Sequence, residues 1–260
     1  MKRVGFVGLI LLMIVMGVST AVARHAPPNT ETTILYDGSL GTPPTTQGLL
    51  YATAFSGPTE TPTTGGVIFN TLVAPLGQLH QAGYAADPAL LPTLRRTTGY
   101  TITVAVQVLN ETHGNNDRAG FSLLALSDDA DGSEPVHGIE LGFWEDEVWA
   151  QNDATQGGYF THGEGVAFDT TTAVITYSLY IITDTYTLSA DGVPILNGPI
   201  RDYTGFTGTI DPYETPNAYG FGDNTTSAGT EVQFNYTAVT VPITAVEPDM
   251  KVYLPVVIRP

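Results

Sequence analysis

The feature that most constrains the fold of this chain is the alternation of apolar and polar residues in short segments. Between Tyr100 and Val108 the even positions, beginning with Ile102 and Val104, are apolar, and the odd positions are mostly polar. A period of two is typical of a β-strand with one buried face. Comparable strand segments occur at 118–127, 139–143, 173–182, 185–200 and 231–241. Turn-forming residues separate them, which predicts an all-β antiparallel two-sheet sandwich.

Helices contribute little to this prediction. The chain has 28 Gly and 18 Pro in 260 residues, and we find no convincing helical periodicity longer than two turns. Residues 74–93 are expected to hold a short helix or a long loop. The remaining strand segments predict one β-sandwich domain over residues 35–242. A linker and a short apolar C-terminal tail would follow at 243–260.

The segment around residue 140 predicts a hairpin with two different faces. Apolar side chains at alternate positions are expected to face the core: Ile139, Leu141 and Phe143. Glu140 and Trp144 would then face outward on the same sheet. The acidic run 145–147 is expected to be a turn, and residues 148–151 to return as the next strand.

The N-terminus predicts export. Lys2 and Arg3 precede an apolar stretch, and small residues at 21–23 suit a cleavage site, so residues 1–23 are expected to be a signal peptide. Residues 24–34 would then be a leader before the domain. No transmembrane span is expected after cleavage, and the protein would be secreted or lie at the cell surface. The chain contains no Cys, which excludes a disulfide framework.

The charge balance excludes one class of partner. The chain carries 26 acidic residues against 9 Lys and Arg, for a formal net charge of −17. Removal of residues 1–23 would also remove two of those basic residues, Lys2 and Arg3. So few positive charges cannot neutralise a row of phosphates, so we expect no nucleic-acid partner.

Three segments carry a resemblance to a known superfamily. They are the hairpin YTLSADGVPILNGPI, the ending FGDNTTSAGTEVQFNYTAVTV and the segment GIELGFWEDEVWAQ. The first two resemble the concanavalin A-like lectin/glucanase jelly roll, and the third resembles a hairpin of its laminin-G-like members. The resemblance covers roughly residues 100–242 and implies a jelly-roll fold. It implies no single function, because the superfamily holds lectins, adhesive modules, hydrolases and lyases. The tail VYLPVVIRP resembles short tails of secreted bacterial surface proteins.

An enzymatic function is the first alternative. Glucan hydrolases of this superfamily place two glutamates on one strand with an aspartate between them. Here Glu145 and Glu147 fall in the expected turn, and Gly142 stands where an aspartate would follow Glu140. The pattern therefore fails, and a solvated acidic turn explains it better. If the protein were an enzyme, the reactive groups would be Glu140, Glu145, Glu147 and His162.

A binding surface fits the residues better. An exposed aromatic ring offers a flat apolar face to a sugar, and nearby carboxylates or amides bind its hydroxyl groups. The candidates are Glu140, Trp144, Trp149, Gln151, Tyr159, His162 and Tyr180. In this interpretation Tyr159 and His162 belong to a loop at the rim. The alternatives are that both tryptophans pack between the sheets, or that they form a protein interface.

A single structural Ca²⁺ is a further expectation. Asp129 and Asp131 stand at D-x-D-G spacing within 128–134, which offers oxygen ligands without a complete helix-flanked calcium loop. The superfamily resemblance implies a site built from an early and a late segment, which points to Asp37 and Asp223. A cation would relieve repulsion in so acidic a chain, although Asp-Gly pairs also form ordinary turns.

Together these observations predict a secreted, non-catalytic module that binds a glycan or an extracellular matrix polymer. Two alternatives remain at this point. One is a polysaccharide-active enzyme, either a glycoside hydrolase or a lyase. The other is a structural cell-surface protein displayed through its C-terminal tail.

Overall fold

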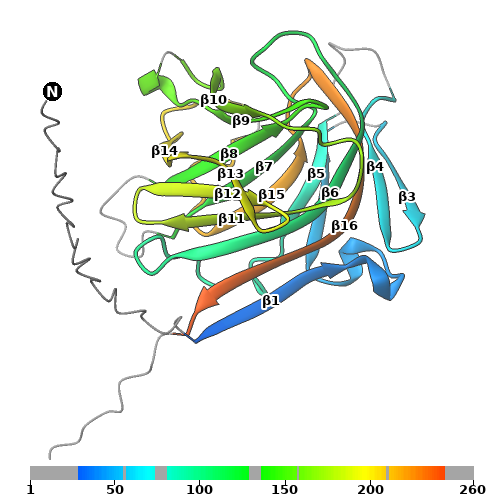
Figure 1. The fold of residues 1–260 in the computed structure, drawn as a ribbon, viewed down its shortest axis with the longest axis horizontal. Coiled ribbons are helices and arrows are strands. Elements are labelled where there is room, and N and C mark those ends of the chain that lie inside the picture. Colours follow the sequence, from blue (N-terminus) through cyan, green and yellow to red (C-terminus); the bar gives the residue numbers. More distant parts are fainter. Residues whose placement is uncertain are drawn as a thin grey trace, which may run out of the picture.

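The computed structural model describes residues 29–54, 57–73, 81–128, 136–156, 158–208 and 211–243, and they form a sandwich of two antiparallel sheets (Figure 1). In order across the first sheet the strands are β13 (Val193–Pro199), β12 (Thr185–Ala190), β11 (Ile175–Ile182), β6 (Tyr100–His113), β16 (Ala228–Pro242), β4 (Gly66–Asn70) and β3 (Thr59–Thr63). Strand β1 (Thr30–Asp37) pairs with the end of β16. The predicted fold class is therefore confirmed.

The second sheet carries the hairpin around residue 140. Its strands in order are β10 (His162–Ala167), β9 (Glu147–Gln151), β8 (His137–Phe143), β7 (Phe121–Leu126), β15 (Ala218–Asp223), β5 (Gln81–Ala86) and β2 (Leu49–Ala54). The two-residue strand β14 (Arg201–Asp202) pairs with the start of β8. Short 3-10 helices are η1 (Gly38–Leu40), η2 (Pro44–Thr46) and η3 (Ala154–Gln156).

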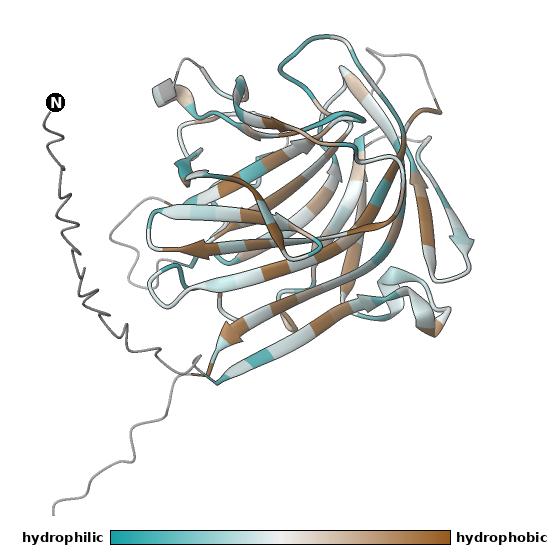
Figure 2. Cartoon of the chain, in the orientation of Figure 1, coloured by the Kyte–Doolittle hydropathy of each residue, from teal (hydrophilic) through white to brown (hydrophobic). Residues whose placement is uncertain are grey.

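The main core lies between the two sheets. Ile102 and Val104 of β6 and Leu141 of β8 are completely buried there, together with the ring of Phe234. Apolar and polar residues alternate along the strands, as the colouring in Figure 2 shows. This arrangement confirms the predicted period of two and its assignment of Ile102 and Leu141 to the buried face.

The hairpin between β12 and β13 also has its predicted turn. Asp191 and Gly192 both adopt positive φ angles, 47° and 80°. Two consecutive positive φ angles are typical of a type I′ turn, which matches the twist of the flanking strands and favours an Asp-Gly pair.

Two sequence expectations are wrong. Strand β1 begins at Thr30, inside the range 24–34 that we expected to be a leader. Its first residues lie on an exposed sheet edge, so they carry no apolar alternation. Residues 81–86, expected to be helix or loop, form strand β5. Its sequence QAGYAA is mostly small residues, which give neither a strand nor a helix signal.

Some predictions fall outside the described residues. They include the signal peptide at 1–23, the tail at 251–260 and the calcium candidates Asp129 and Asp131. In the part of the chain that is described, no helix has the length and apolar character needed to span a bilayer.

Candidate functional site

A buried carboxylate organises the outer face of the second sheet, that is, the face turned away from the first sheet. Glu140 lies on β8 between two residues that face the core, so its side chain points to the outer face. It is completely buried there. Its carboxylate accepts hydrogen bonds from Tyr213 Oη (2.6 Å), Asn224 Nδ2 (2.6 Å) and Gln151 Nε2 (2.9 Å). One carboxylate thus joins β8 to β9 and to two loop segments.

A tyrosine hydroxyl separates β8 from β9 beside this carboxylate. The Tyr203 hydroxyl accepts a hydrogen bond from the Glu140 N–H (3.3 Å) and donates one to the Gln151 carbonyl (2.6 Å). Direct pairing of the two strands covers Leu141 to Phe143 of β8. Beyond Leu141 the Tyr203 hydroxyl therefore bridges the two strands in place of a direct backbone hydrogen bond. The side chain of Gln151 lies next to this bridge and donates to Glu140.

Burial shifts the pKa values of Glu140 and of its donor Tyr213. Burial raises the pKa of the Glu140 carboxyl, while hydrogen bonds from Tyr213, Asn224 and Ser122 and the charge of Arg118 act against the rise. Burial and the neighbouring Glu140 charge also hold the pKa of the Tyr213 phenol well above its usual value. Tyr213 therefore remains protonated and can act as a stable donor to Glu140.

A cavity of about 340 Å³ lies over this group. Its lining includes Gln151, Tyr213 and Asn224. These three side chains therefore contact the cavity and also donate hydrogen bonds to Glu140. The other lining residues are Gln81, Arg118, Ala119, Phe160, Phe206, Pro212, Thr225, Thr226 and Ser227. Gln151 Oε1 is buried and has no hydrogen-bond partner among the described residues. The cavity thus combines a polar floor, one unsatisfied acceptor and an aromatic wall. We call it the Glu140 cavity.

A second hollow of about 420 Å³ adjoins the Glu140 cavity and shares Gln81, Pro212 and Asn224 with it. Small residues, including Gly83 and Gly220, form part of its lining. A Cβ atom on Gly83 would come within 2.6 Å of the Phe221 carbonyl oxygen, so this position requires glycine. The two hollows make one extended depression across the outer face.

The two tryptophans occupy neither of the expected positions. Trp144 and Trp149 are 8% and 0% exposed, so the prediction of an exposed aromatic platform is wrong. They form a cluster with Ala119 that is separate from the main core, so they do not pack between the sheets either. Trp149 does point to the outer face, where its ring lies over Gly142, but neighbouring side chains cover it.

Histidines provide part of that cover. The His162 ring packs edge-on against Trp149, with centroids 4.4 Å apart, and against Trp144 at 5.2 Å. His162 Nε2 lies 3.2 Å from Glu147 Oε1. The His113 ring stacks on Trp144 at 4.3 Å, and its Nδ1 lies 2.8 Å from Glu111 Oε2. His162 is thus part of an aromatic cluster at the β8–β9 hairpin.

The structure does not gather the four residues named for an enzyme. Glu145 lies exposed in the predicted turn and accepts a hydrogen bond from the Glu111 N–H (3.1 Å). Glu147 pairs with His162, whereas Glu140 is bound by Tyr213, Asn224 and Gln151. Among the described residues, no hydrogen bond or ion pair joins Glu140 to the other three.

The two predicted tyrosines lie on different sides of the molecule. Tyr180 is 42% exposed on β11 of the first sheet, so it does not belong to the surface we expected to share with Glu140. Tyr159 packs against Phe160 and Phe206, both of which line the Glu140 cavity. Tyr159 therefore lies next to the wall of this cavity.

The two described calcium candidates have separate surroundings. Asp37 ends β1 and accepts hydrogen bonds from the Ser39 N–H (2.9 Å) and Oγ (2.6 Å), which caps η1. Asp223 is buried at the end of β15 in the other sheet and accepts one from the Thr225 N–H (3.0 Å). Burial raises the Asp223 pKa to about 8. No group of three or more His, Asp or Glu side chains suited to a metal ion occurs in the described ranges.

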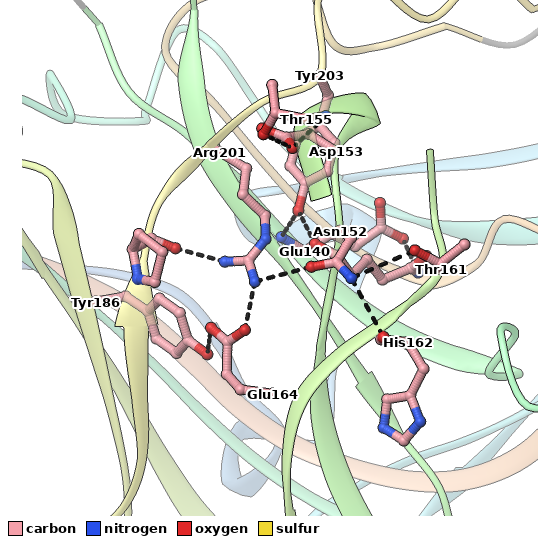
Figure 3. Close-up of polar contacts among 12 residues, drawn as sticks. Glu140, Asn152, Asp153, Thr155, Thr161, His162, Glu164, Tyr186, Arg201 and Tyr203 are labelled. Carbon is pink, nitrogen blue, oxygen red and sulfur yellow. Dashed lines mark hydrogen bonds and ion pairs between the residues drawn. The ribbon is translucent and has the colours of Figure 1, made fainter. Parts of the chain in front are cut away.

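A polar network joins the edges of the two sheets beside the site (Figure 3). The buried Arg201 guanidinium of β14 pairs with Glu164 of β10 and donates to Asn152 Oδ1 (3.2 Å). Glu164 also accepts a hydrogen bond from the Tyr186 hydroxyl of β12 (2.8 Å). Through these contacts the network connects β12 of the first sheet to β10 and β14 of the second.

Several residues of the site were not predicted. Tyr203, Tyr213 and Asn224 lie outside the alternating segments or at their ends, where a period of two gives no information on side-chain direction. Asn224 stands in the segment that carried the superfamily resemblance, and this resemblance was the signal in the sequence that could have pointed to it as a site residue. Glu140 and Gln151 were predicted for a binding surface, and the structure brings them together.

The comparisons with known proteins concern the fold. No protein-family model and no curated protein sequence matches the chain. A carbohydrate esterase from the Shiga toxin-encoding bacteriophage phi24B has a similar structure, with a TM-score of 0.53 and 14% identity over 82% of this chain and 99% of that one. A Bacillus licheniformis β-glucanase has a TM-score of 0.44 and 12% identity, over 82% of this chain and 99% of its own. The VIP36 exoplasmic/lumenal domain has a TM-score of 0.44 and 12% identity, over 82% of this chain and 89% of its own. The similarity to the phage protein shows a shared fold alone, which in this chain is the antiparallel two-sheet sandwich described above.

Proposed function

We propose that this protein binds a neutral glycan in the Glu140 cavity and its adjoining hollow. The observation that carries the proposal is the use of one buried carboxylate to position Gln151, Tyr213 and Asn224 at the cavity. Sugar hydroxyl groups both donate and accept hydrogen bonds, so they suit a floor of amide and phenol groups. Phe160 and Phe206 add apolar surface for the faces of the sugar rings.

Charge supports a neutral ligand. Of the described residues that line the Glu140 cavity, Arg118 alone is basic, and the chain has a formal net charge of −17. A polyanionic glycan would be repelled by such a protein. The adjoining hollow, with its small lining residues, has room for a further sugar unit, so an oligosaccharide fits better than a monosaccharide. The phage protein of similar fold is described as a carbohydrate esterase, which agrees with a carbohydrate ligand.

We assign a non-catalytic role to this site. A general acid or nucleophile must reach the bond that it attacks, and Glu140 is completely buried and its carboxylate is held by hydrogen bonds from Gln151, Tyr213 and Asn224, among others. The acidic residues of the β8–β9 turn do not join it. The signal-peptide pattern of residues 1–23 supports secretion, so the proposed ligand is an extracellular glycan or matrix polymer.

The test is an incubation of residues 24–260 with a panel of neutral and acidic polysaccharides, read for retention of the protein and for released sugar ends. We expect retention on a neutral polysaccharide without product. Asn224→Ala should weaken retention about tenfold, the effect of losing roughly 1.4 kcal/mol of binding free energy. The matched control is Asn197→Ala, at an exposed position of β13 in the first sheet, which should bind like the wild type.

Two results would contradict this proposal. Released sugar ends would show an enzyme, and Glu140, Glu147 and His162 would become the residues to vary. Retention that is equal in the Asn224 and Asn197 variants would place the binding surface elsewhere on the molecule.

A further inference from the structure

A separate cavity of about 290 Å³ lies on another part of the sandwich. It is enclosed by the segment that holds η1 and η2 and by the hairpin of β3 and β4, which lie side by side in Figure 1. Its lining includes Tyr36, Thr42, Pro43, Pro44, Glu60 and Pro62, and it shares no residue with the Glu140 cavity. The two segments meet closely, since a Cβ atom on Gly38 would come within 2.2 Å of the Gly65 carbonyl oxygen.

The carboxylate of this cavity is held in position by a buried phenol. Glu60 lies on β3 opposite Phe69 of β4, so the two side chains share one face of this edge hairpin, where Glu60 remains exposed at its edge. Glu60 Oε1 accepts a hydrogen bond from the buried Tyr84 hydroxyl. Burial and this carboxylate raise the pKa of the Tyr84 phenol, so it stays a donor. Within the described residues, Glu60 Oε2 accepts no hydrogen bond.

The cavity also offers a second oxygen atom as an acceptor. Tyr36 is 1% exposed, and its ring stacks on Phe234 with centroids 4.9 Å apart. Tyr36 lines the cavity. The neighbouring carboxylate of Asp37 is turned to Ser39 instead. A phenol oxygen can accept a hydrogen bond, so the Tyr36 hydroxyl can bind a donor group of a ligand.

We propose that this cavity binds a primary ammonium group on a short apolar stem, as at the end of a lysine side chain or in a free alkyl amine. The ammonium donates to Glu60 Oε2 and to the Tyr36 hydroxyl oxygen. The stem packs on Pro43, Pro44 and Pro62. Within the described ranges no Lys, Arg or His lines the cavity, so no basic side chain of its described wall competes for the carboxylate. The net negative charge of the protein also attracts a cationic ligand from longer distances.

The test is an NMR titration of the full mature chain with n-butylammonium. The amide signals of Gly41, Thr63 and Gly66, at the cavity wall, should shift and saturate with a Kd on the order of 1 mM, as suits so small a ligand. Neutral 1-pentanol of similar size should not saturate. Added salt should weaken the binding, because ionic strength screens the charge of Glu60.

Two substitutions and one control identify the groups. Glu60→Gln keeps an acceptor for Tyr84 and removes the charge, and it should weaken butylammonium binding about tenfold. Tyr36→Phe keeps the ring stack and removes the acceptor, and it should weaken binding severalfold. Glu31→Gln, at an exposed position of β1 away from the cavity wall, should change nothing.

A parallel titration with Nα-acetyl-lysine methylamide distinguishes the two sources of the ammonium group. Saturation by both probes supports a lysine side chain of a partner protein, and saturation by butylammonium alone supports a free amine. The proposal is overturned if butylammonium does not saturate, if 1-pentanol binds equally well, or if Glu60→Gln binds like the wild type. None of these results depends on the glycan proposal, because the two cavities share no residues.

Discussion

Among single residues, Glu140 is a completely buried carboxylate that accepts hydrogen bonds from Gln151, Tyr213 and Asn224. Its donors Tyr213 and Gln151 are themselves buried, so Glu140→Ala would leave them without an acceptor. We expect the free energy of unfolding, measured by urea denaturation, to fall by about 3 kcal/mol. Glu214→Ala, at the exposed neighbour of Tyr213, is the control and should stay within about 0.5 kcal/mol of the wild type. Equal effects of the two substitutions would contradict the role given to Glu140.

Asp223 makes stability depend on pH. Its pKa rises from 3.8 to about 8 on folding, mainly because of burial. Between these values the folded protein holds a proton that the unfolded chain has lost, so stability falls as pH rises, by roughly 1 kcal/mol per pH unit. Asp223→Asn removes this contribution. In urea unfolding from pH 5 to pH 8 with EDTA present, we expect the variant to lose less stability than the wild type. Parallel pH profiles would show that Asp223 is ionised in the folded state.

At the level of elements, the Tyr203 hydroxyl sets the separation of β8 and β9. Tyr203→Phe would leave the Glu140 N–H and the Gln151 carbonyl without their present partner in a buried region. We expect a loss of about 2 kcal/mol of stability and faster hydrogen exchange at the Glu140 amide. Tyr180→Phe, on an exposed ring of β11, is the matched control. Unchanged exchange at Glu140 would show that the two strands pair without the hydroxyl.

The elements differ in how far the sequence predicts them. Strand β6 was predictable because one face is buried and the other is polar, so the alternation of Ile102 and Val104 with their neighbours is regular. Strands β1 and β5 escaped prediction because one lies at an exposed edge and the other consists mainly of small residues. The same limit applies to the site. Glu140 and Gln151 lie on strands and were predicted, whereas Tyr213 and Asn224 reach the site from loops, whose direction depends on tertiary contacts.

On the scale of the whole molecule, the first and last strands pair with each other. Thr30 of β1 lies opposite Pro242 of β16, so the two ends of the described chain meet at one place (Figure 1). A chain of residues 29–243 therefore keeps the pairing of both sheets, and we expect its urea midpoint to equal that of residues 24–260. A chain that begins at Gly38 loses β1 and with it the buried Leu35 and Tyr36.

This shorter chain would also expose the edge of β16, and free edges promote association between molecules. We expect its free energy of unfolding to fall by several kcal/mol, since each lost side chain contributes about 2 kcal/mol, so it should unfold at a lower urea concentration. We also expect it to elute as aggregates in size-exclusion chromatography. A reduced midpoint for residues 29–243 would instead show that segments outside the sandwich stabilise it. That result would count against a structural surface protein displayed through its tail, because the segments outside the sandwich would then be part of the fold rather than a separate element for display.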